Sequence, residues 1–321
     1  MPDRRVVLCP GQGAQTVAMG KAWHDHADAS RAVFEQADTA LANIWADLAS
    51  DLADTPLSAL CFEGPADTLN RTDACQPAIF VASVASWHGL CEAEGVDPRA
   101  ASLEAAAGLS LGEYTALHIA GAIAFEPALR LVALRGRAMQ DAADAEPSSM
   151  VALIGADEAK ANELCDRARA EGEVLVPANF NAPGQVVVSG SAAACDRAEA
   201  VAGEVGLRAT RLQVAGAFHS PLMRPAADRL AEALAQTEIA MPRASVISNV
   251  TAEPHRSPDE IRRGLFDQLT SPVRWAQSCE WLVTEMQGGA SFHELAPGRS
   301  LAGMMRRISR DTKVITHDAP A

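Results

Sequence analysis

The stretch "AAAGLSLGEYTAL", residues 105–117, places Ser110 between Gly108 and Gly112. Gly-x-Ser-x-Gly is the spacing of a sharp turn from a strand into a helix, with the serine hydroxyl displayed at its apex. The two glycines remove Cβ atoms where the strand and the helix pass closely. The stretch therefore predicts a nucleophilic serine, although the same five-residue pattern also occurs in turns without chemistry.

The residues on either side of Ser110 give the turn its expected surroundings. The alanine-rich segment 103–107 favours a helix by intrinsic propensity, but the motif requires a strand, which we predict there. The amide of Leu111 comes at the start of a helix expected over 112–121, where it can donate to a developing oxyanion. Glu113, in the first turn of that helix, is interpreted as a structural acid and not as a catalytic one.

Farther along the chain, the pattern of strands and helices changes at about residue 146. Strand-like "MVALIG", "VLVPANF", "QVVVSG" and "RATRLQV" alternate with helical patterns at 157–171 and 192–206 in the order βαββαβ. That order is the ferredoxin-like arrangement, which can bury its own sheet under two helices. We predict a ferredoxin-like subdomain over 146–213, inserted in a larger α/β domain made of 1–145 and 214–321.

The larger domain begins with the apolar strand "VVLC", which leads into the glycine-rich loop "PGQG" at 10–13. Its other expected elements, from the apolar periodicity, are helices at 21–38, 78–94 (after Pro77), 127–142, 221–236, 258–269, 277–287 and 300–309, and strands at 244–250, 291–295 and 312–316.

Composition excludes several classes of protein. The chain has 321 residues, and 27 basic against 41 acidic residues give a net charge of −14, which disfavours nucleic acid and anionic lipid as partners. No apolar run is long enough to span a membrane, and we expect no signal peptide. The seven cysteines are scattered without a C-x-x-C pair, so we expect reduced thiols and a cytoplasmic location.

A serine nucleophile needs a base, and His219 is the best placed of the eight histidines. It lies in "VAGAFHSPLM", a loop between a strand and a helix, where catalytic groups of α/β proteins gather. A histidine that merely caps the following helix remains an alternative. His24 and His26 fit a solvated helix face, and nothing local marks the remaining five, which are His88, His118, His255, His293 and His317.

Seven separated stretches together resemble one family, the malonyl-CoA:acyl carrier protein transacylases, which include the acyltransferase domains of fatty acid and polyketide synthases. The stretches are "PGQGAQ" (10–15), "GLSLGEYTALHIAGAI" (108–123), "LVALRGRAMQ" (131–140), "NFNAPGQVVVSG" (179–190), "GAFHSPLMRPAADRL" (216–230), "DQLTSPVRW" (267–275) and "ELAPGRSLAGM" (294–304). The resemblance spans nearly the whole chain. It implies an α/β-hydrolase-like fold for the large domain.

The resemblance also implies a role for individual residues. Ser110 matches the nucleophile and His219 the general base, supported by the main-chain carbonyl at Gln268. The oxyanion hole corresponds to the amides of Gln12 and Leu111. The family most often has histidine where this chain has Leu109, which leaves in doubt any polar contact that the histidine makes around the acyl group.

Three further residues match the family's substrate-binding positions. Arg135 matches the arginine that grips the malonyl carboxylate, a role that suits the two parallel donors of a guanidinium. Phe218 matches the bulky residue of malonyl-specific domains, so we predict malonyl over methylmalonyl. Asn181 matches a position facing the cleft, while Asn249 and Met139 match lining or positioning residues.

The implied reaction moves malonyl from malonyl-CoA to the phosphopantetheine thiol of an acyl carrier protein, through a malonyl-serine and without cofactor or metal. Because the carrier is typically acidic, we expect a basic patch to dock it, formed by Arg306, Arg307, Arg310 and Lys313 or by Arg262 and Arg263. Three alternatives stay open: a serine hydrolase or thioesterase, a non-catalytic scaffold, and a trans-acting malonyltransferase of a polyketide synthase.

Overall fold

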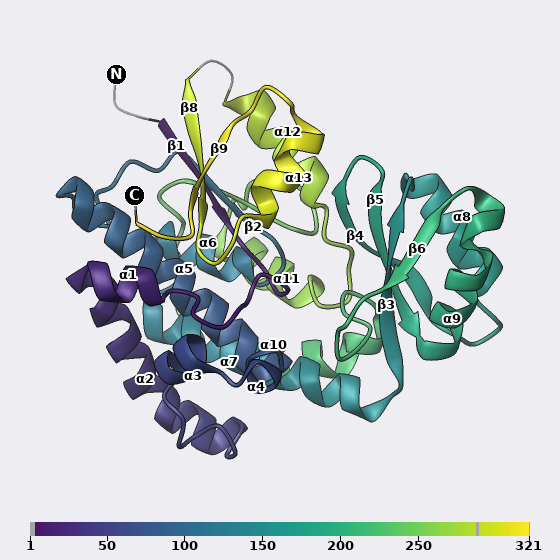
Figure 1. The fold of residues 1–321 in the computed structure, drawn as a ribbon, viewed down its shortest axis with the longest axis horizontal. Coiled ribbons are helices and arrows are strands. Elements are labelled where there is room, and N and C mark those ends of the chain that lie inside the picture. The colour runs from purple at the N-terminus through teal and green to yellow at the C-terminus, as the bar shows by residue number, and fades with distance from the viewer. Residues whose placement is uncertain (1–3, 287–288, 321) are drawn as a thin grey trace.

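The computed structural model describes residues 4–286 and 289–320. Two separate β-sheets organise this part of the chain (Figure 1). The parallel sheet and most helices form the body that contains both ends of the described chain, and the antiparallel sheet forms a smaller unit beside it, drawn in teal and green. The predicted mixed α/β architecture, with one parallel and one separate antiparallel sheet, is confirmed.

The larger sheet has five parallel strands in the order β7-β2-β1-β8-β9. They are β1 (Arg4–Cys9), β2 (Ala105–Gly108), β7 (Ser245–Ile247), β8 (Ala290–Leu295) and β9 (Val314–His317). In the register of β1 with β2, Cys9 lies opposite Gly108. The loops that follow the two strands, one with "PGQG" and one with Ser110, therefore begin side by side at the carboxyl edge of the sheet.

Strand β2 confirms the strand that the motif predicted against local propensity. Ala105, Ala106 and Ala107 are completely buried, and they pair with β1 on one side and β7 on the other. Pairing on both sides satisfies the backbone of β2, and this tertiary gain outweighs the few tenths of a kcal/mol by which alanine prefers a helix.

Helices pack around the parallel sheet. They are α1 (Lys21–His26), α2 (Asp28–Leu48), α3 (Leu57–Glu63), α4 (Ala66–Leu69), α5 (Thr72–Glu94), α6 (Gly112–Ile119), α7 (Phe125–Ala145), α10 (Arg224–Gln236), α11 (Pro258–Asp267), α12 (Trp275–Glu285) and α13 (Ser300–Ile308), with a 3₁₀ turn η2 (Pro221–Met223). Helix α5 is buried on almost every face and packs on both α2 and α7, so it forms the centre of the helical layer.

Two helix predictions were wrong in detail. The helix expected after Pro77 begins at Thr72 and contains Pro77, because burial of the whole segment compensates for the one backbone hydrogen bond that proline removes. The helix expected over 21–38 is broken at Ala27, which is extended, and α2 continues to Leu48. The short helices α3 and α4 were not predicted.

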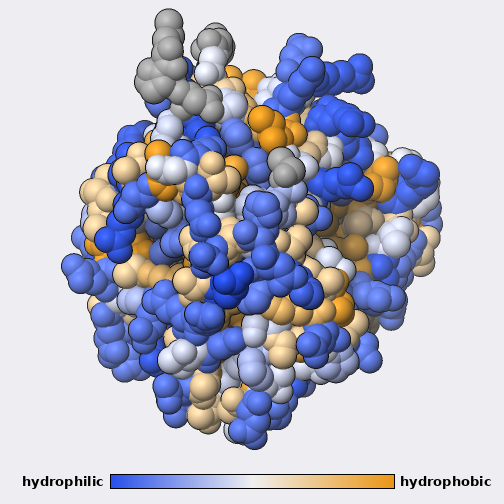
Figure 2. All heavy atoms as spheres, turned by 60° about the vertical axis from the view of Figure 1, so that its left-hand side comes forward, coloured by the Kyte–Doolittle hydropathy of each residue, from blue (hydrophilic) through white to orange (hydrophobic). Residues whose placement is uncertain are grey.

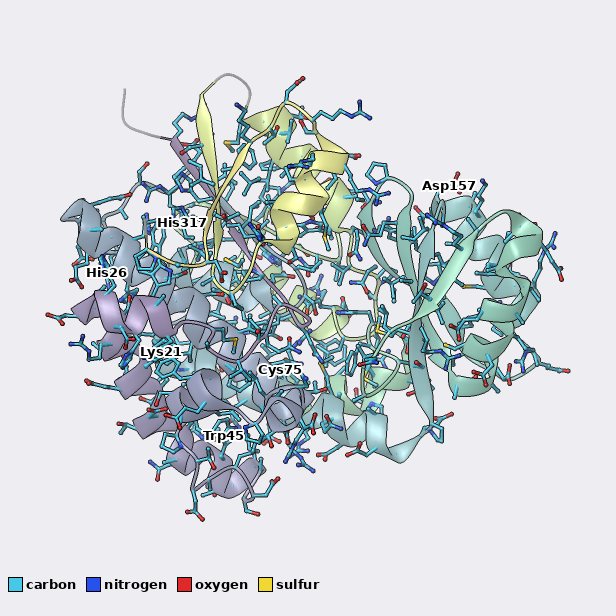
Figure 3. All side chains as sticks on the ribbon, viewed as in Figure 1. Lys21, His26, Trp45, Cys75, Asp157 and His317 are labelled. Atoms are coloured by element: carbon cyan, nitrogen blue, oxygen red, sulfur yellow. The ribbon has the colours of Figure 1, made fainter. Side chains whose placement is uncertain are left out.

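The smaller sheet is antiparallel, in the order β4-β5-β3-β6. Its elements are β3 (Ser148–Ile154), α8 (Glu158–Ala168), β4 (Leu175–Ala182), β5 (Gln185–Ser191), α9 (Ala192–Val201), the 3₁₀ turn η1 (Ala202–Val205) and β6 (Arg208–Arg211). The side chain of Asp157 caps α8, in the smaller unit on the right of Figure 3. The sheet and its two helices have their own core. The domain boundaries at residues 146 and 213 stay a prediction.

One backbone bridge joins the two parts. Phe180, on β4, donates its amide to the carbonyl of Val273, and Val273 donates to Ala178. Val273 lies just before α12 of the larger body. The edge of the small sheet is thereby fixed against the segment that follows Gln268.

The exterior is mostly hydrophilic on the face shown in Figure 2, where apolar residues are interspersed among polar ones. Among the helices that the structure describes, none is both long and apolar enough to cross a membrane. All seven cysteines are free and buried; Cys75, for example, lies inside the helical layer (Figure 3), and burial raises the pKa of its thiol.

Candidate active site

Ser110 stands on a strained turn between β2 and α6. Its φ is +53°, in the left-handed region that side chains other than glycine rarely adopt. A Cβ on Gly108 would lie 1.8 Å from the carbonyl carbon of Gly112, and one on Gly112 would lie 2.1 Å from the carbonyl oxygen of Cys9. Both positions therefore require glycine. The start of α6 lies in close contact with the end of β1.

Asn249, which follows β7, braces this turn on both sides of the serine. Its Oδ1 accepts from the amide of Ser110 at 2.6 Å, and its Nδ2 donates to the carbonyl of Gly108 at 2.7 Å. The contacts hold the strained backbone in place. Asn249 thus stabilises the turn through the backbone groups of Ser110 and Gly108.

His219 is hydrogen-bonded to the hydroxyl of Ser110. Its Nε2 lies 2.8 Å from Ser110 Oγ, and its Nδ1 lies 2.8 Å from the carbonyl oxygen of Gln268. A carbonyl only accepts, so Nδ1 carries the proton, and Nε2 of the neutral ring is left to accept from the serine hydroxyl. Burial, and then the nearby Arg135, lower the pKa of His219 to about 4, which keeps the ring neutral at physiological pH.

Arg135, on α7, brings a guanidinium to the same hydroxyl. Nη2 donates to Ser110 Oγ and to Gln268 Oε1, both at 2.9 Å, and Nη1 donates to Gln76 Oε1 at 2.7 Å. The side chain is 1% exposed, and burial lowers its pKa. Within the described residues, no carboxylate forms an ion pair with Arg135, and its Nε has no hydrogen-bond partner.

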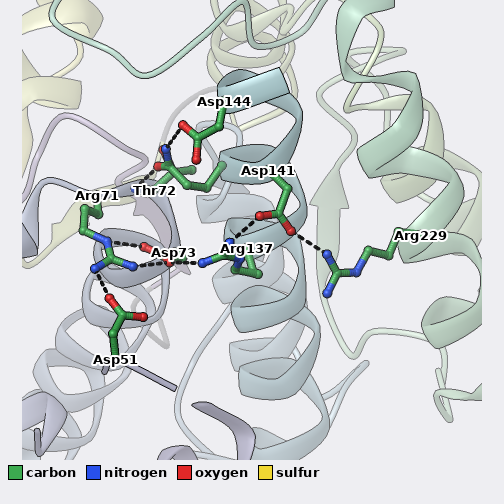
Figure 4. Close-up of polar contacts among 9 residues, drawn as sticks. Asp51, Arg71, Thr72, Asp73, Arg137, Asp141, Asp144 and Arg229 are labelled. Carbon is green, nitrogen blue, oxygen red and sulfur yellow. Dashed lines mark hydrogen bonds and ion pairs between the residues drawn. The ribbon is translucent and has the colours of Figure 1, made fainter. Parts of the chain in front are cut away.

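A chain of ion pairs holds helix α7, which carries Arg135, in position (Figure 4). The buried carboxylate of Asp73, on α5, accepts from Arg71 and from Arg137 of α7. Arg137 also pairs with Asp141, which in turn pairs with Arg229 of α10. The network ties α5, α7 and α10 together.

The other predicted site residues are placed as follows. Leu111 and Gln268 are fully buried, Phe218 and Asn181 are buried, and Gln12 is half-buried. Neither the amide of Gln12 nor that of Leu111 donates to another group among the described residues. Asn181 Oδ1 also lacks a hydrogen-bond partner there. No hydrogen bond of the described residues joins Phe218 or Asn181 to Ser110, so the structure brings together Ser110, His219, Arg135 and Gln268 directly.

Glu113 and His255 form a buried pair that the sequence did not reveal. Nε2 of His255 lies 2.8 Å from Oε1 of Glu113. Glu113 is completely buried and accepts hydrogen bonds from Asn249 and Gln268 of the site; its interpretation as a structural acid stays a prediction. Nothing local could have indicated His255, because its partner lies 142 positions away in the chain. Gln76 was also missed, since only the fold brings it to Arg135.

Within residues 4–286 and 289–320, no three His, Cys, Asp or Glu side chains are grouped closely enough to hold a metal ion.

Comparison with known proteins gives the family. The model of the acyl transferase domain family matches residues 6–313. A malonyl CoA-acyl carrier protein transacylase of Bacillus subtilis is 38% identical over 314 residues, which cover 98% of this chain and 93% of the relative. The chain belongs to the malonyl-CoA:acyl carrier protein transacylase family. The resemblance found in the sequence is thereby confirmed.

Solved structures of transacylases have the same fold. The malonyl CoA-acyl carrier protein transacylase of Coxiella burnetii superposes with a TM-score of 0.89 at 38% identity, covering 99% of this chain and 95% of that one. A malonyl-transacylase in complex with a type II polyketide-synthase acyl-carrier protein gives a TM-score of 0.88 at 34% identity, covering 99% and 96%.

Proposed function

We propose that this chain is a malonyl-CoA:acyl carrier protein S-malonyltransferase, acting in fatty acid biosynthesis in the cytoplasm. The observation that carries the proposal is the guanidinium of Arg135, buried 2.9 Å from the hydroxyl of Ser110 and bonded only to neutral oxygens. A buried charge without a directly bonded counter-ion is costly. An acyl group that brings its own carboxylate, as malonyl does, supplies the counter-ion at the position where the ester forms.

In the first half-reaction, Ser110 attacks the thioester carbonyl of malonyl-CoA while Nε2 of His219 takes its proton. The carbonyl of Gln268 keeps the Nδ1 proton in place and stabilises the imidazolium that forms. The amides of Gln12 and Leu111 stabilise the oxyanion, a role that suits their lack of internal partners. The C–S bond then breaks, and His219 returns its proton to the sulfur of coenzyme A.

In the second half-reaction, the phosphopantetheine thiol of the carrier protein attacks the malonyl ester. His219, neutral again, takes the thiol proton and gives it to Ser110 Oγ as the ester bond breaks. The products are malonyl carrier protein and the free enzyme, so the scheme is ping-pong.

The carboxylate of malonyl is held by Arg135, which excludes plain acyl groups because they leave the guanidinium unpaired. Phe218, buried next to His219, supports malonyl over the bulkier methylmalonyl. Asn181, with an unpartnered Oδ1, is proposed to contact the substrate.

The finer description of the fold belongs to the same proposal. The five parallel strands with helices around them support an α/β-hydrolase-like large domain. The order β4-β5-β3-β6, reached through βαββαβ connections, supports a ferredoxin-like subdomain.

The carrier protein is proposed to dock at a basic cluster at the C-terminal end of α13 and just beyond it, and not at Arg262 and Arg263. Arg306, Arg307 and Arg310 are exposed and, with Pro183 of the small sheet, line a cavity of about 620 Å³. Arg307 donates to the carbonyl of Pro183, and within the described part of the chain none of the three pairs with a carboxylate. Arg262, in contrast, donates to the carbonyls of Leu234 and Thr237 and pairs with Asp259.

Intact mass spectrometry tests the proposed function. After mixing with malonyl-CoA, we expect a malonyl adduct that is absent from Ser110→Ala, persists in water and disappears when a phosphopantetheinylated carrier protein is added. Rapid loss of the adduct to water would favour a thioesterase instead.

A polyketide pathway is the second candidate, because one solved relative was captured with a polyketide carrier protein. The chemistry is the same. A comparison of transfer rates to the fatty acid carrier and to polyketide carriers from the same cell separates the two.

A further inference from the structure

The pair of Glu113 and His255 lies behind the serine turn, away from the reacting atoms. Glu113 is in the first turn of α6, and His255 is in the loop between β7 and α11. Their side chains are 0% and 3% exposed. An ionised carboxylate only accepts, so Nε2 of His255 donates to Oε1 of Glu113.

The other oxygen of Glu113 holds two groups of the active site. Oε2 accepts from Nε2 of Gln268 at 2.7 Å and from the backbone amide of Asn249 at 3.1 Å. Asn249 in turn accepts the amide of Ser110. The carboxylate of Glu113 thus accepts hydrogen bonds from His255, Gln268 and Asn249.

The side chain of Gln268 connects the carboxylate of Glu113 to the guanidinium of Arg135. Its Nε2 is taken by Glu113 and by the carbonyl of Ser110, so its Oε1 faces Nη2 of Arg135. Turning the amide over would set its oxygen against the carboxylate and its NH₂ against the guanidinium, which is unfavourable at both ends. The orientation of Gln268, and hence the contact that it makes with Arg135, therefore depends on Glu113.

We propose that Glu113 and His255 are a positioning pair that sets the selectivity of this site for acyl groups bearing a carboxylate. The proposal rests on the proposed function. Without His255, Oε1 of a buried carboxylate loses its donor, the Glu113 side chain turns, and Gln268 no longer holds Arg135 in place. Acetyl brings no carboxylate to the guanidinium, so its transfer depends less on the pair.

The test compares acylation of Ser110 by malonyl-CoA and by acetyl-CoA over a range of concentrations, followed by intact mass, together with the melting temperature. We expect His255→Met to lower the malonyl-to-acetyl ratio of kcat/KM about tenfold, because the variant loses one buried charge-assisted hydrogen bond. His255→Gln should restore most of the ratio, since its Nε2 can donate from nearly the same place. His88→Met, the same change on α5, should leave the ratio unaltered.

A second variant tests the pair without removing it. A Cβ on Gly264 of α11 would lie 3.0 Å from Cε1 of His255, and alanine favours the helix. Gly264→Ala should therefore displace the ring slightly and lower the ratio in the same direction by a smaller factor.

Equal losses for both acyl donors in His255→Met, or no rescue by His255→Gln, would show a merely structural role and overturn the proposal. A ratio unmoved by Gly264→Ala would also count against it. A wild-type chain that forms no malonyl adduct would overturn the proposed function itself, a result distinct from an adduct whose selectivity ignores His255.

Discussion

At the scale of single residues, Arg135 makes the site specific, because its guanidinium reaches the hydroxyl that carries the acyl group. We expect Arg135→Ala to slow acylation by malonyl-CoA about 100-fold, the loss of a bidentate charged contact. Acetylation should change far less. Stopped-time intact mass with the two acyl-CoA donors gives both rates, and equal losses would rule out the carboxylate contact.

His219 predicts the pH dependence of acylation. Its pKa is lowered to about 4 by burial and by Arg135, so the base is neutral above that pH. The rate at low malonyl-CoA should therefore stay level down to about pH 5 and fall below it. Arg135→Gln removes the positive charge that helps to lower the pKa of His219, so this pKa should rise. The fall of the acylation rate at low pH, measured with acetyl-CoA, should then begin at a higher pH. A fall that begins at the same pH would contradict this coupling.

The sequence revealed the residues with a local signature and missed those without one. Ser110 is marked by its glycines and His219 by its loop, whereas the family resemblance was needed for Arg135 and Gln268. His255 carries no local signal, because a histidine acquires its role from a partner that only the fold brings near.

At the scale of elements, the turn between β2 and α6 depends on the absence of a side chain at Gly108. Its Cβ would lie 1.8 Å from backbone, so Gly108→Ala should cost on the order of 3 kcal/mol and abolish acylation. Gly203→Ala, where a Cβ meets nothing within 4 Å, is the matched control. Thermal unfolding and adduct formation are the measurements, and a stable, active Gly108→Ala would refute the geometry of the turn.

The ion-pair chain on α7 should also be measurable. Asp73 is 1% exposed and accepts from Arg71 and Arg137, so Asp73→Ala leaves two cations facing each other and should cost about 3 kcal/mol. Asp228→Ala removes an exposed pair with Arg224 and should cost less than about 1 kcal/mol. Urea unfolding of the two variants compares them, and similar costs would show that the chain does not hold α7.

Most elements could be predicted from apolar periodicity, and two of the exceptions share a cause. Strand β2 consists mostly of alanines, which prefer a helix, and the first turns of α5 contain Pro77, which disfavours one. In each case burial on nearly every face decides the outcome, and a single sequence does not show which segment becomes buried on all sides.

At the scale of the whole molecule, the acidic chain has to attract an acidic partner. The exposed arginines of α13 provide a local exception to a net charge of −14. We expect the double variant Arg306→Glu and Arg307→Glu to raise the KM for carrier protein at least about tenfold and to leave malonyl-CoA loading unchanged. Arg263→Glu is the control, and an unchanged KM in the double variant would exclude this docking site.

The central claim is that Ser110, His219 and Arg135 act on one acyl group. A crystal structure of the wild-type chain loaded with malonyl-CoA, without carrier protein, tests it most directly. We expect the ester on Ser110 Oγ and the free carboxylate within hydrogen-bond distance of both Nη1 and Nη2 of Arg135. A malonyl carboxylate that points to solvent or to another cation would contradict the account.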